Sequence, residues 1–233
     1  MHVPGFLATF KTIVVNDIMA EVRSKQNLVT LTLFGVVLAH IFAFGFTNDA
    51  TTNQRIFPGV LWGCVFFTAA LGVGRTFARE AEEGAFTALV LSPGDRAGLL
   101  VAKMVVNCLL SFVTVVVVFP LLVMLLDVKL IDPDGLPVTG IICAQLGSGL
   151  VGFSVVATPL AVMAVNARFA EVLLPLIIFP MVTPILIAGV SGTGIALGTV
   201  VGDSTIPWLQ FTWAFALLFG VLGVILFEHM VAE

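Results

Sequence analysis

Charged residues are scarce in this sequence. Only 10% of its 233 residues are Asp, Glu, Lys or Arg, while 59% are hydrophobic. A soluble domain carries about 25% charged residues. A large core does not account for this deficit, because a soluble protein must still cover its surface with polar groups. The composition therefore excludes an ordinary soluble domain and places the chain among the membrane proteins.

Motifs for catalysis and for nucleotide or metal binding are also missing. There is no Gly-x-x-x-x-Gly-Lys-[Ser/Thr] phosphate loop, no Cys-x-x-Cys pair, no Ser/His/Asp set and no paired carboxylate. The glycine-rich run at 192–198 lacks the lysine, and we interpret it as a flexible exterior link. His40 has no second ligand at helical spacing, which favours a structural histidine. We expect a non-enzymatic chain with no metal and no cofactor of its own.

What the sequence does contain is long apolar runs. A membrane-spanning helix needs roughly 20 apolar residues, because the hydrocarbon core is about 30 Å thick. Continuous runs, without the alternation of barrel strands, favour helices. Lys103 and Glu171 fall inside these runs but near their ends, where a charge costs least. The six predicted spans are Leu28–Phe46, Ile56–Gly74, Leu99–Leu126, Val138–Val165, Phe169–Val190 and Pro207–Phe227.

The distribution of basic residues predicts the orientation of these spans. With both termini in the cytoplasm, eight of the ten Lys and Arg residues fall on the inner side. Only Arg55 and Lys129 fall outside. The sequence therefore predicts an all-α membrane protein with six transmembrane helices, N-in and C-in, as a single domain over 1–233.

Residues 1–27 predict a helix of a different kind. Hydrophobic side chains recur at every fourth position, and charged ones occupy the other faces, as in an amphipathic helix on the inner membrane surface. The recurring residues are Phe6, Phe10, Val14, Ile18 and Val22.

Residues 75–98 are the most patterned cytoplasmic segment. Arg79 and Glu83 are spaced to pair on a helix that continues the second span, and Gly84 then breaks it. A short amphipathic helix with Phe86 and Leu89 on its apolar face follows, and a Ser-Pro-Gly turn ends it. An apolar face beside a charge cluster suits a docking surface for a partner, or a helix lying on lipid headgroups.

Small residues and prolines mark two of the spans. Pro175, Pro180 and Pro184 each remove a backbone hydrogen bond from the fifth span, so we expect a kinked or interrupted helix. Such a helix either lines a pathway and moves, or is simply packed around its kinks. In the fourth span the ridge of Ala144, Ser148 and Gly152 permits close helix approach, within the subunit or between two copies.

Four blocks of sequence, in order along the chain, resemble one family of membrane subunits. The block from Glu80 through Pro93 to Lys103 resembles the cytoplasmic loop of ABC-2-type permeases, which contacts a separate ATP-binding subunit. With the other blocks, it resembles the cytochrome c maturation protein B family, also called haem exporter protein B. The other blocks are Glu21–Lys25, Pro58–Trp62, and Asn166–Leu176 with its continuation through Pro180 to Pro184–Ile187.

The resemblance implies partners and a cellular site. A separate subunit would bind ATP, and this chain would pass the resulting motion on to haem delivery or to release of a haem-loaded chaperone. The implied partners are a haem-handling membrane subunit, a small membrane subunit and a second copy of the chain, all in the cytoplasmic (inner) membrane, with no nucleic acid. The ATPase-docking residues would be Arg79, Glu80, Glu82, Glu83, Gly84, Phe86, Leu89, Leu91, Pro93 and Arg96.

Other functions fit the same pattern. An exporter of drugs, lipids or polysaccharide belongs to the same broad class, and a non-transporting assembly scaffold would also need a docking loop. An ion-coupled transporter is disfavoured, because such proteins use carboxylates inside the membrane, and only Glu171, at a span boundary, comes close.

Overall fold

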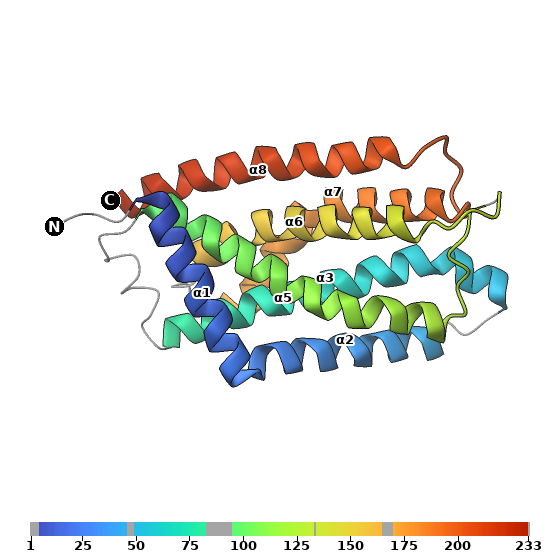
Figure 1. Ribbon diagram of the computed structural model, residues 1–233, viewed down its shortest axis with the longest axis horizontal. Coiled ribbons are helices and arrows are strands. Elements are labelled where there is room, and N and C mark those ends of the chain that lie inside the picture. The colour runs from blue at the N-terminus through green and yellow to red at the C-terminus, as the bar shows by residue number, and fades with distance from the viewer. Residues whose placement is uncertain (1–4, 46–48, 83–94, 133, 165–169, 233) are drawn as a thin grey trace.

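The structure, a computed structural model, describes residues 5–45, 49–82, 95–132, 134–164 and 170–232. Within these ranges the chain is all-helical, with a single isolated bridge between Ile131 and Pro137 outside the helices. Figure 1 shows an elongated bundle. Its helices are α1 (Phe6–Ser24), α2 (Gln26–Gly45), α3 (Ala50–Glu82), α5 (Arg96–Leu125), α6 (Thr139–Ala164), α7 (Ala170–Ala196) and α8 (Ile206–Ala232).

Six of these helices, α2, α3 and α5 to α8, are long and apolar enough to cross a membrane. Each of them contains most of one predicted span, so the fold class expected from the sequence is confirmed. The apolar part of α3 ends at Thr76, but the helix continues to Glu82. This extension of the second span as a charged helix was predicted from the spacing of its charges.

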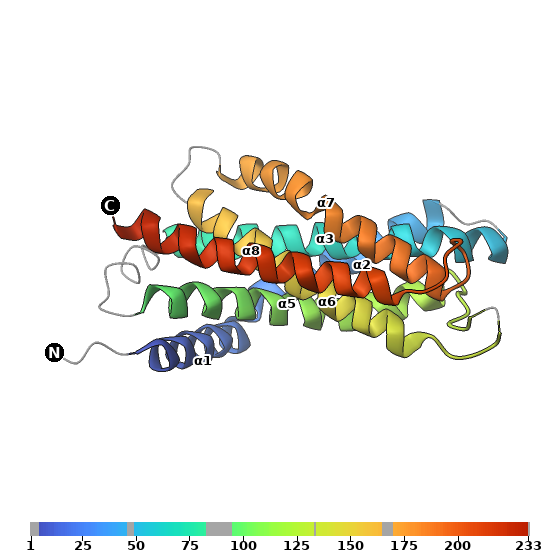
Figure 2. The same ribbon diagram turned by 90° about the horizontal axis from the view of Figure 1, so that it is seen from above.

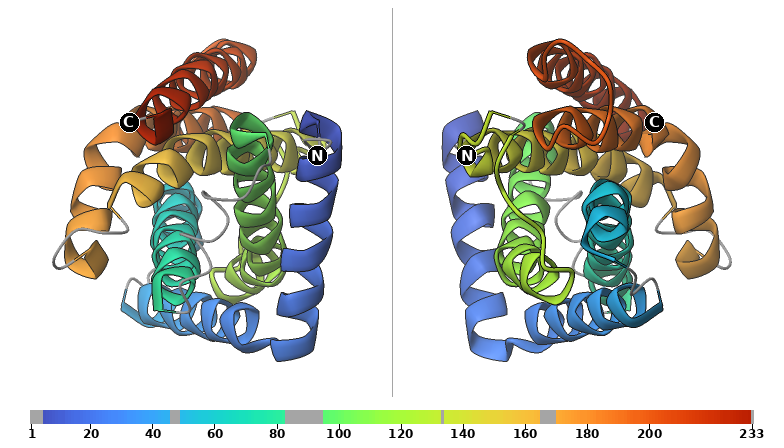
Figure 3. Two further views of the ribbon diagram at one scale, coloured as in Figure 1. Left: turned by 90° about the vertical axis from the view of Figure 1, so that its left-hand side faces the viewer. Right: turned by 90° about the vertical axis from the view of Figure 1, so that its right-hand side faces the viewer.

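The spans run up and down the bundle, so both described ends of the chain lie at one end of it (Figure 1). The last residues of α3 and the first of α5 lie at this same end, which we call the terminal end. The opposite end holds the connections from α2 to α3, α5 to α6 and α7 to α8. Helix α1 is not a span. It lies across the side of the bundle at the terminal end, steeply inclined to the spans (Figures 1 and 3).

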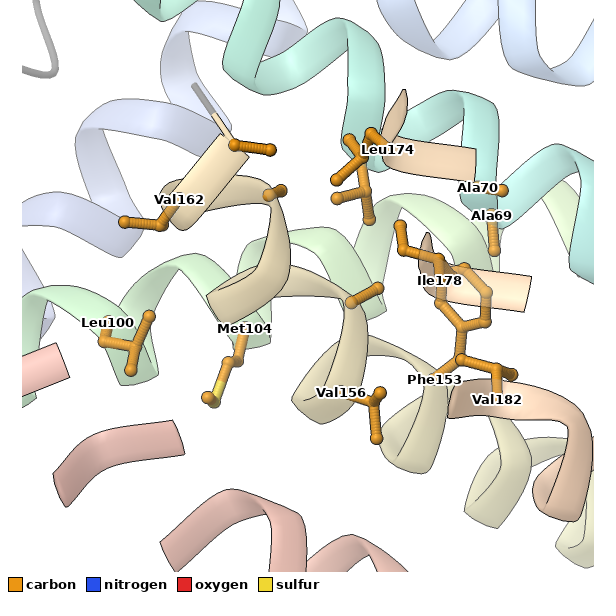
Figure 4. Packing of buried hydrophobic residues seen from close by; sticks show 14 of the residues in the cluster. Ala69, Ala70, Leu100, Met104, Phe153, Val156, Val162, Leu174, Ile178 and Val182 are labelled. Carbon is orange, nitrogen blue, oxygen red and sulfur yellow. The ribbon is translucent and has the colours of Figure 1, made fainter. Parts of the chain in front are cut away.

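Two clusters of buried apolar side chains hold the bundle together. The first lies towards the terminal end, where Ile178 of α7 and Phe153 of α6 meet Ala69 of α3 (Figure 4). The second lies towards the opposite end and surrounds Trp62 and Phe57 of α3. Both clusters combine helices far apart in the sequence, so the spans form one packed unit.

Trp62 is held in a slot between α6 and α7. A Cβ atom added to Gly149 or to Gly189 would lie 2.3 Å from its ring. The ring nitrogen Nε1 donates a hydrogen bond to Thr193 Oγ1 at 3.0 Å. Small residues allow this close approach of the helices, and the hydrogen bond satisfies a polar group buried in the membrane region.

This packing corrects one expectation. The run at 192–198 is not wholly a flexible link, because α7 continues to Ala196 and only the following residues form a loop. Thr193 is fully buried against Trp62, and Gly192 packs on Gln145 of α6. The glycines in this run allow close contact between helices. From the sequence alone, the same glycines were interpreted as a flexible link.

The prolines and the small-residue ridge have visible effects. Helix α7 stays helical through Pro175, Pro180 and Pro184, but it is bent, as Figures 2 and 3 show. The kink is therefore confirmed and an interruption is not. On α6, Ser148 is buried, and Gly152 lies against Ile185 of α7 and Thr212 of α8, so this part of the ridge packs within the subunit.

Candidate coupling site

The predicted docking residues fall into three groups in the structure. Arg79, Glu80 and Glu82 lie in the last turns of α3, and Arg96 is the exposed first residue of α5. The remaining predicted residues lie outside the described residues. The parts of the site that can be described are the end of α3, the start of α5, and α1, which packs against α5. These outlying residues are Glu83, Gly84, Phe86, Leu89, Leu91 and Pro93.

The start of α5 is built to contact α1. Asp95 caps α5, since its Oδ1 accepts a hydrogen bond from the Gly98 amide at 2.7 Å. The Asp95 amide in turn donates to Thr9 Oγ1 of α1 at 3.2 Å. A Cβ atom added to Gly98 would lie 2.9 Å from the Phe6 carbonyl oxygen. Glycine at this position therefore lets the two backbones touch.

About two turns beyond the Thr9–Asp95 contact, α1 and α5 share an ion pair. Lys103 Nζ lies 2.7 Å from Asp17 Oδ2. The lysine side chain is 1% exposed and the aspartate 27%. A cation buried within a membrane span requires a partner, because its desolvation is costly. Asp17 therefore anchors α1 to the first part of the third span.

Both residues were assigned to helices from the sequence, but their pairing was not predicted. Lys103 was predicted as a charge near a span end, and Asp17 as one of the charges on the remaining faces of the first helix. A single lysine inside an otherwise apolar span is a signal that an acidic partner is needed. The sequence offers several acids near that end, so it does not identify which one.

Helix α1 has two apolar faces. Thr9 and Ile13 are buried against the bundle, and Phe10 and Val14 pack beside them. The predicted stripe is therefore divided, because Phe10 and Val14 pack on the bundle whereas Phe6, Ile18 and Val22 are exposed. The exposed members and other exposed apolar side chains form the surface away from the bundle. The most exposed are Leu7 at 77%, Val22 at 63%, Met19 at 44% and Val15 at 43%.

A tight corner connects α1 to α2 and to α3. Lys25 adopts a left-handed conformation with φ 54°, which ends α1 and lets α2 begin at the next residue. Glu21 Oε1 accepts a hydrogen bond from the Leu28 amide in the first turn of α2 at 2.7 Å. Asn27 Nδ2 donates to Thr76 Oγ1 of α3 at 3.3 Å. Helix α1 is thus attached to α5 directly and to α3 through the start of α2.

The two ends of the bundle differ in charge. The terminal end carries most of the basic residues of the described chain, such as Lys11, Arg23 and Arg75. At the opposite end, the hydroxyl groups of Thr51 and Thr52 donate hydrogen bonds to Asp49 and lower its pKa to about 2. Other acids at that end are Asp127, Asp132, Asp134 and Asp203, beside the two bases Arg55 and Lys129.

The contacts described at the terminal end join helices to one another. Among the described residues, no group of three His, Cys, Asp or Glu side chains is placed to hold a metal ion. The ring of His40 contacts the Val36 carbonyl oxygen of its own helix at 2.7 Å and lies beside Phe44. The terminal end instead joins α1 to the two helices that flank residues 83–94, directly to α5 and through the start of α2 to α3.

Comparison with known proteins adds an independent finding. The family model described as CcmB protein matches residues 8–231 of the chain. The chain is 27% identical over 189 residues to Heme exporter protein B of Pseudomonas aeruginosa, covering 80% of this chain and 81% of that protein. It is 25% identical over 179 residues to Heme exporter protein B of Paracoccus denitrificans, covering 77% and 79% respectively. The protein of the same name from Haemophilus influenzae is 23% identical over 178 residues, covering 76% of this chain and 78% of that protein.

Proposed function

Because the chain belongs to the CcmB protein family, we propose that it is the membrane-spanning permease subunit of an ATP-driven complex for haem export and cytochrome c maturation. The name Heme exporter protein B, borne by three relatives, supports the haem-related role. The six apolar helices support a multi-pass permease. The sequence has no phosphate loop, so ATP hydrolysis belongs to a separate subunit.

The terminal end faces the cytoplasm in this proposal. Basic residues favour the cytoplasmic side of a membrane protein. Helix α1, the last part of α3 and the start of α5 lie at this end (Figure 1), and they carry Lys11, Arg23, Arg75 and Arg96, with Lys25 directly after α1. The chain then belongs to the inner membrane, with the acidic loops at the opposite end facing outwards.

Residues 75–98 receive the ATP-binding subunit. The observation that carries this assignment is that both flanks of residues 83–94 are tied to the N-terminal helices. Helix α5 contacts α1 through Thr9–Asp95 and Asp17–Lys103, and α3 contacts the start of α2 through Asn27–Thr76. A force applied to this segment reaches α3 and α5 directly. It also reaches α2 through α1, so three spans move together.

The remaining partners follow from the family. The complex would contain a haem-handling membrane subunit, a small membrane subunit and a second copy of this chain. ATP hydrolysis would drive haem delivery or release of the haem-loaded chaperone. Haem is cargo of the complex here, and the ring of His40 contacts the Val36 carbonyl oxygen of its own helix.

The docking assignment is tested by two variants inside the loop and one outside it. Gly84→Pro and Phe86→Asp should abolish co-purification of the ATP-binding subunit while membrane insertion persists. The matched control is Leu136→Asp, which puts the same charge on a residue that is 62% exposed at the opposite end of the bundle. This control should co-purify normally. Normal co-purification of the Phe86→Asp variant would overturn the assignment.

The haem-related role has its own test. Deletion of this chain should stop cytochrome c assembly, and an ATP-binding subunit that cannot hydrolyse ATP should stop it equally. Normal assembly with the hydrolysis-deficient subunit would indicate a scaffold, and normal assembly after deletion would indicate export of another substrate.

A further inference from the structure

A group of exposed basic residues surrounds the corner between α1 and α2. Arg23 and Lys25 lie at the end of α1, and both are exposed. The hydrogen bond between Asn27 and Thr76 joins α3 to this corner, and Arg75, which precedes Thr76, has an exposed side chain.

The acidic residues of α1 do not neutralise this group. Asp17 faces the bundle and pairs with the buried Lys103. Glu21 is turned towards α2, where its carboxylate accepts the hydrogen bond from the Leu28 amide. The amide donor is neutral, so the Glu21 carboxylate keeps its charge and offsets one cation. Three cations against one carboxylate leave a net positive charge at the corner.

A stripe of exposed apolar residues on α2 begins next to the corner. Lys25 accepts the amide hydrogen bond of Val29 through its carbonyl oxygen, so the stripe starts one turn after this lysine. Its members recur at every fourth residue along α2 and face away from the bundle, so they meet lipid. They are Val29 at 48% exposed, Leu33 at 60%, Val37 at 52% and Ile41 at 59%.

We propose that Arg23, Lys25 and Arg75 bind the headgroup phosphate of an anionic phospholipid, whose acyl chain lies along the Val29–Ile41 stripe of α2. Arginine and lysine are the side chains suited to phosphate. Basic residues at a membrane surface attract anionic lipids. The cations lie at the membrane surface and the apolar stripe extends from them into the hydrocarbon region. These two parts match the charged headgroup and the acyl chain of one lipid molecule. The proposal needs the chain to lie in a bilayer, and it is independent of ATPase docking.

An acidic surface of the ATP-binding subunit would also attract these cations. The structure favours lipid, because the outward side chains beside the corner are apolar. Val22 is 63% exposed and Met19 is 44% exposed on the same end of α1. An interfacial helix that lies on lipid buries such apolar side chains in the acyl-chain region while its cations meet the headgroups.

The test uses the full chain reconstituted in bilayer nanodiscs of phosphatidylcholine and phosphatidylglycerol. The readout is the rise in melting temperature as the phosphatidylglycerol fraction increases. Arg23→Gln/Lys25→Gln should need about 25-fold more phosphatidylglycerol for half the rise, since each cation near an anionic surface contributes roughly fivefold. Adding Arg75→Gln should abolish the rise. The wild-type response should weaken at high salt.

Two further variants keep the test decisive. Arg55→Gln/Lys129→Gln removes the same charge from the opposite end, where both side chains are exposed, and should respond as the wild type does. Arg23→Lys/Arg75→Lys keeps the charge and should retain most of the response. An unchanged response of Arg23→Gln/Lys25→Gln, or an equal loss in the control, would overturn the proposal. So would a variant that responds normally to phosphatidylglycerol but no longer co-purifies with the ATP-binding subunit.

Discussion

At the residue scale, two buried polar contacts join helices that are far apart in the sequence. Lys103 pairs with Asp17, and Trp62 donates to Thr193. Each contact satisfies a polar group in a region where water is scarce, so each fixes one arrangement of its helices. The composition predicted neither contact, because a lone lysine or tryptophan shows the need for a partner without naming it.

Removing the partner of Lys103 should destabilise the protein. Asp17→Asn removes the carboxylate that lies 2.7 Å from the ammonium group of a lysine that is 1% exposed, and we expect a loss of about 2–3 kcal/mol. This is less than for a fully buried pair because Asp17 is 27% exposed. Replacing both residues with Asp17→Asn/Lys103→Met should recover most of the loss, since no buried charge remains. Thermal unfolding in detergent measures both. An unchanged stability of Asp17→Asn would mean that the pair does not anchor α1.

The slot around Trp62 should not accept a methyl group. Gly149→Ala would place a Cβ atom 2.3 Å from the indole, a rigid ring that is 1% exposed and cannot move aside. We expect destabilisation of about 1–3 kcal/mol. Gly147→Ala, two residues away on the same helix, meets nothing within 4 Å and should be neutral or slightly stabilising. Equal stability of the two variants in the same unfolding assay would contradict the packing described for Trp62.

At the scale of the element, the helices themselves were largely predictable. All six spans were found from runs of about 20 apolar residues, because this length is set by the bilayer. The end of α7 was placed too early. Its glycines at 192 and 194 resemble a loop, but they lie where α7 packs closely on α6 and on the chain after Ala196. Helix α1 was also predicted, while the division of its apolar stripe into a buried and an exposed part was not, since it depends on where α5 lies.

The contact between α1 and α5 provides a prediction at this scale. Gly98→Ala would bring a Cβ atom to 2.9 Å from the Phe6 carbonyl oxygen, and a backbone atom yields less easily than a side chain. We expect the first turns of α1 to separate from α5, with faster amide hydrogen exchange over residues 6–14. Gly140→Ala on α6 has open space around it and should leave this exchange unchanged. Unaltered exchange in Gly98→Ala would show that α1 is not held there.

At the scale of the whole molecule, the charges fall into two groups with different roles. Those at the opposite end, including Asp49 with its pKa of about 2, lie in loops and on exposed helix ends. Those at the terminal end lie on α1 and on the helices that flank residues 83–94. The sequence predicted this separation from the position of Lys and Arg alone. The contacts of α1 with α5, and of the start of α2 with α3, could not be predicted from the sequence, because they depend on the three-dimensional arrangement of the helices.

The central claim is that residues 75–98 contact a separate ATP-binding subunit. The most direct measurement places a photo-cross-linking amino acid at position 86 in the complete membrane complex and identifies the covalent product. Position 136, which is 62% exposed at the opposite end of the bundle, provides the matched control. We predict an adduct with the ATP-binding subunit from position 86 and none from position 136. The claim would be contradicted by an adduct with the ATP-binding subunit from position 136. It would also be contradicted if position 86 gave adducts with lipid alone.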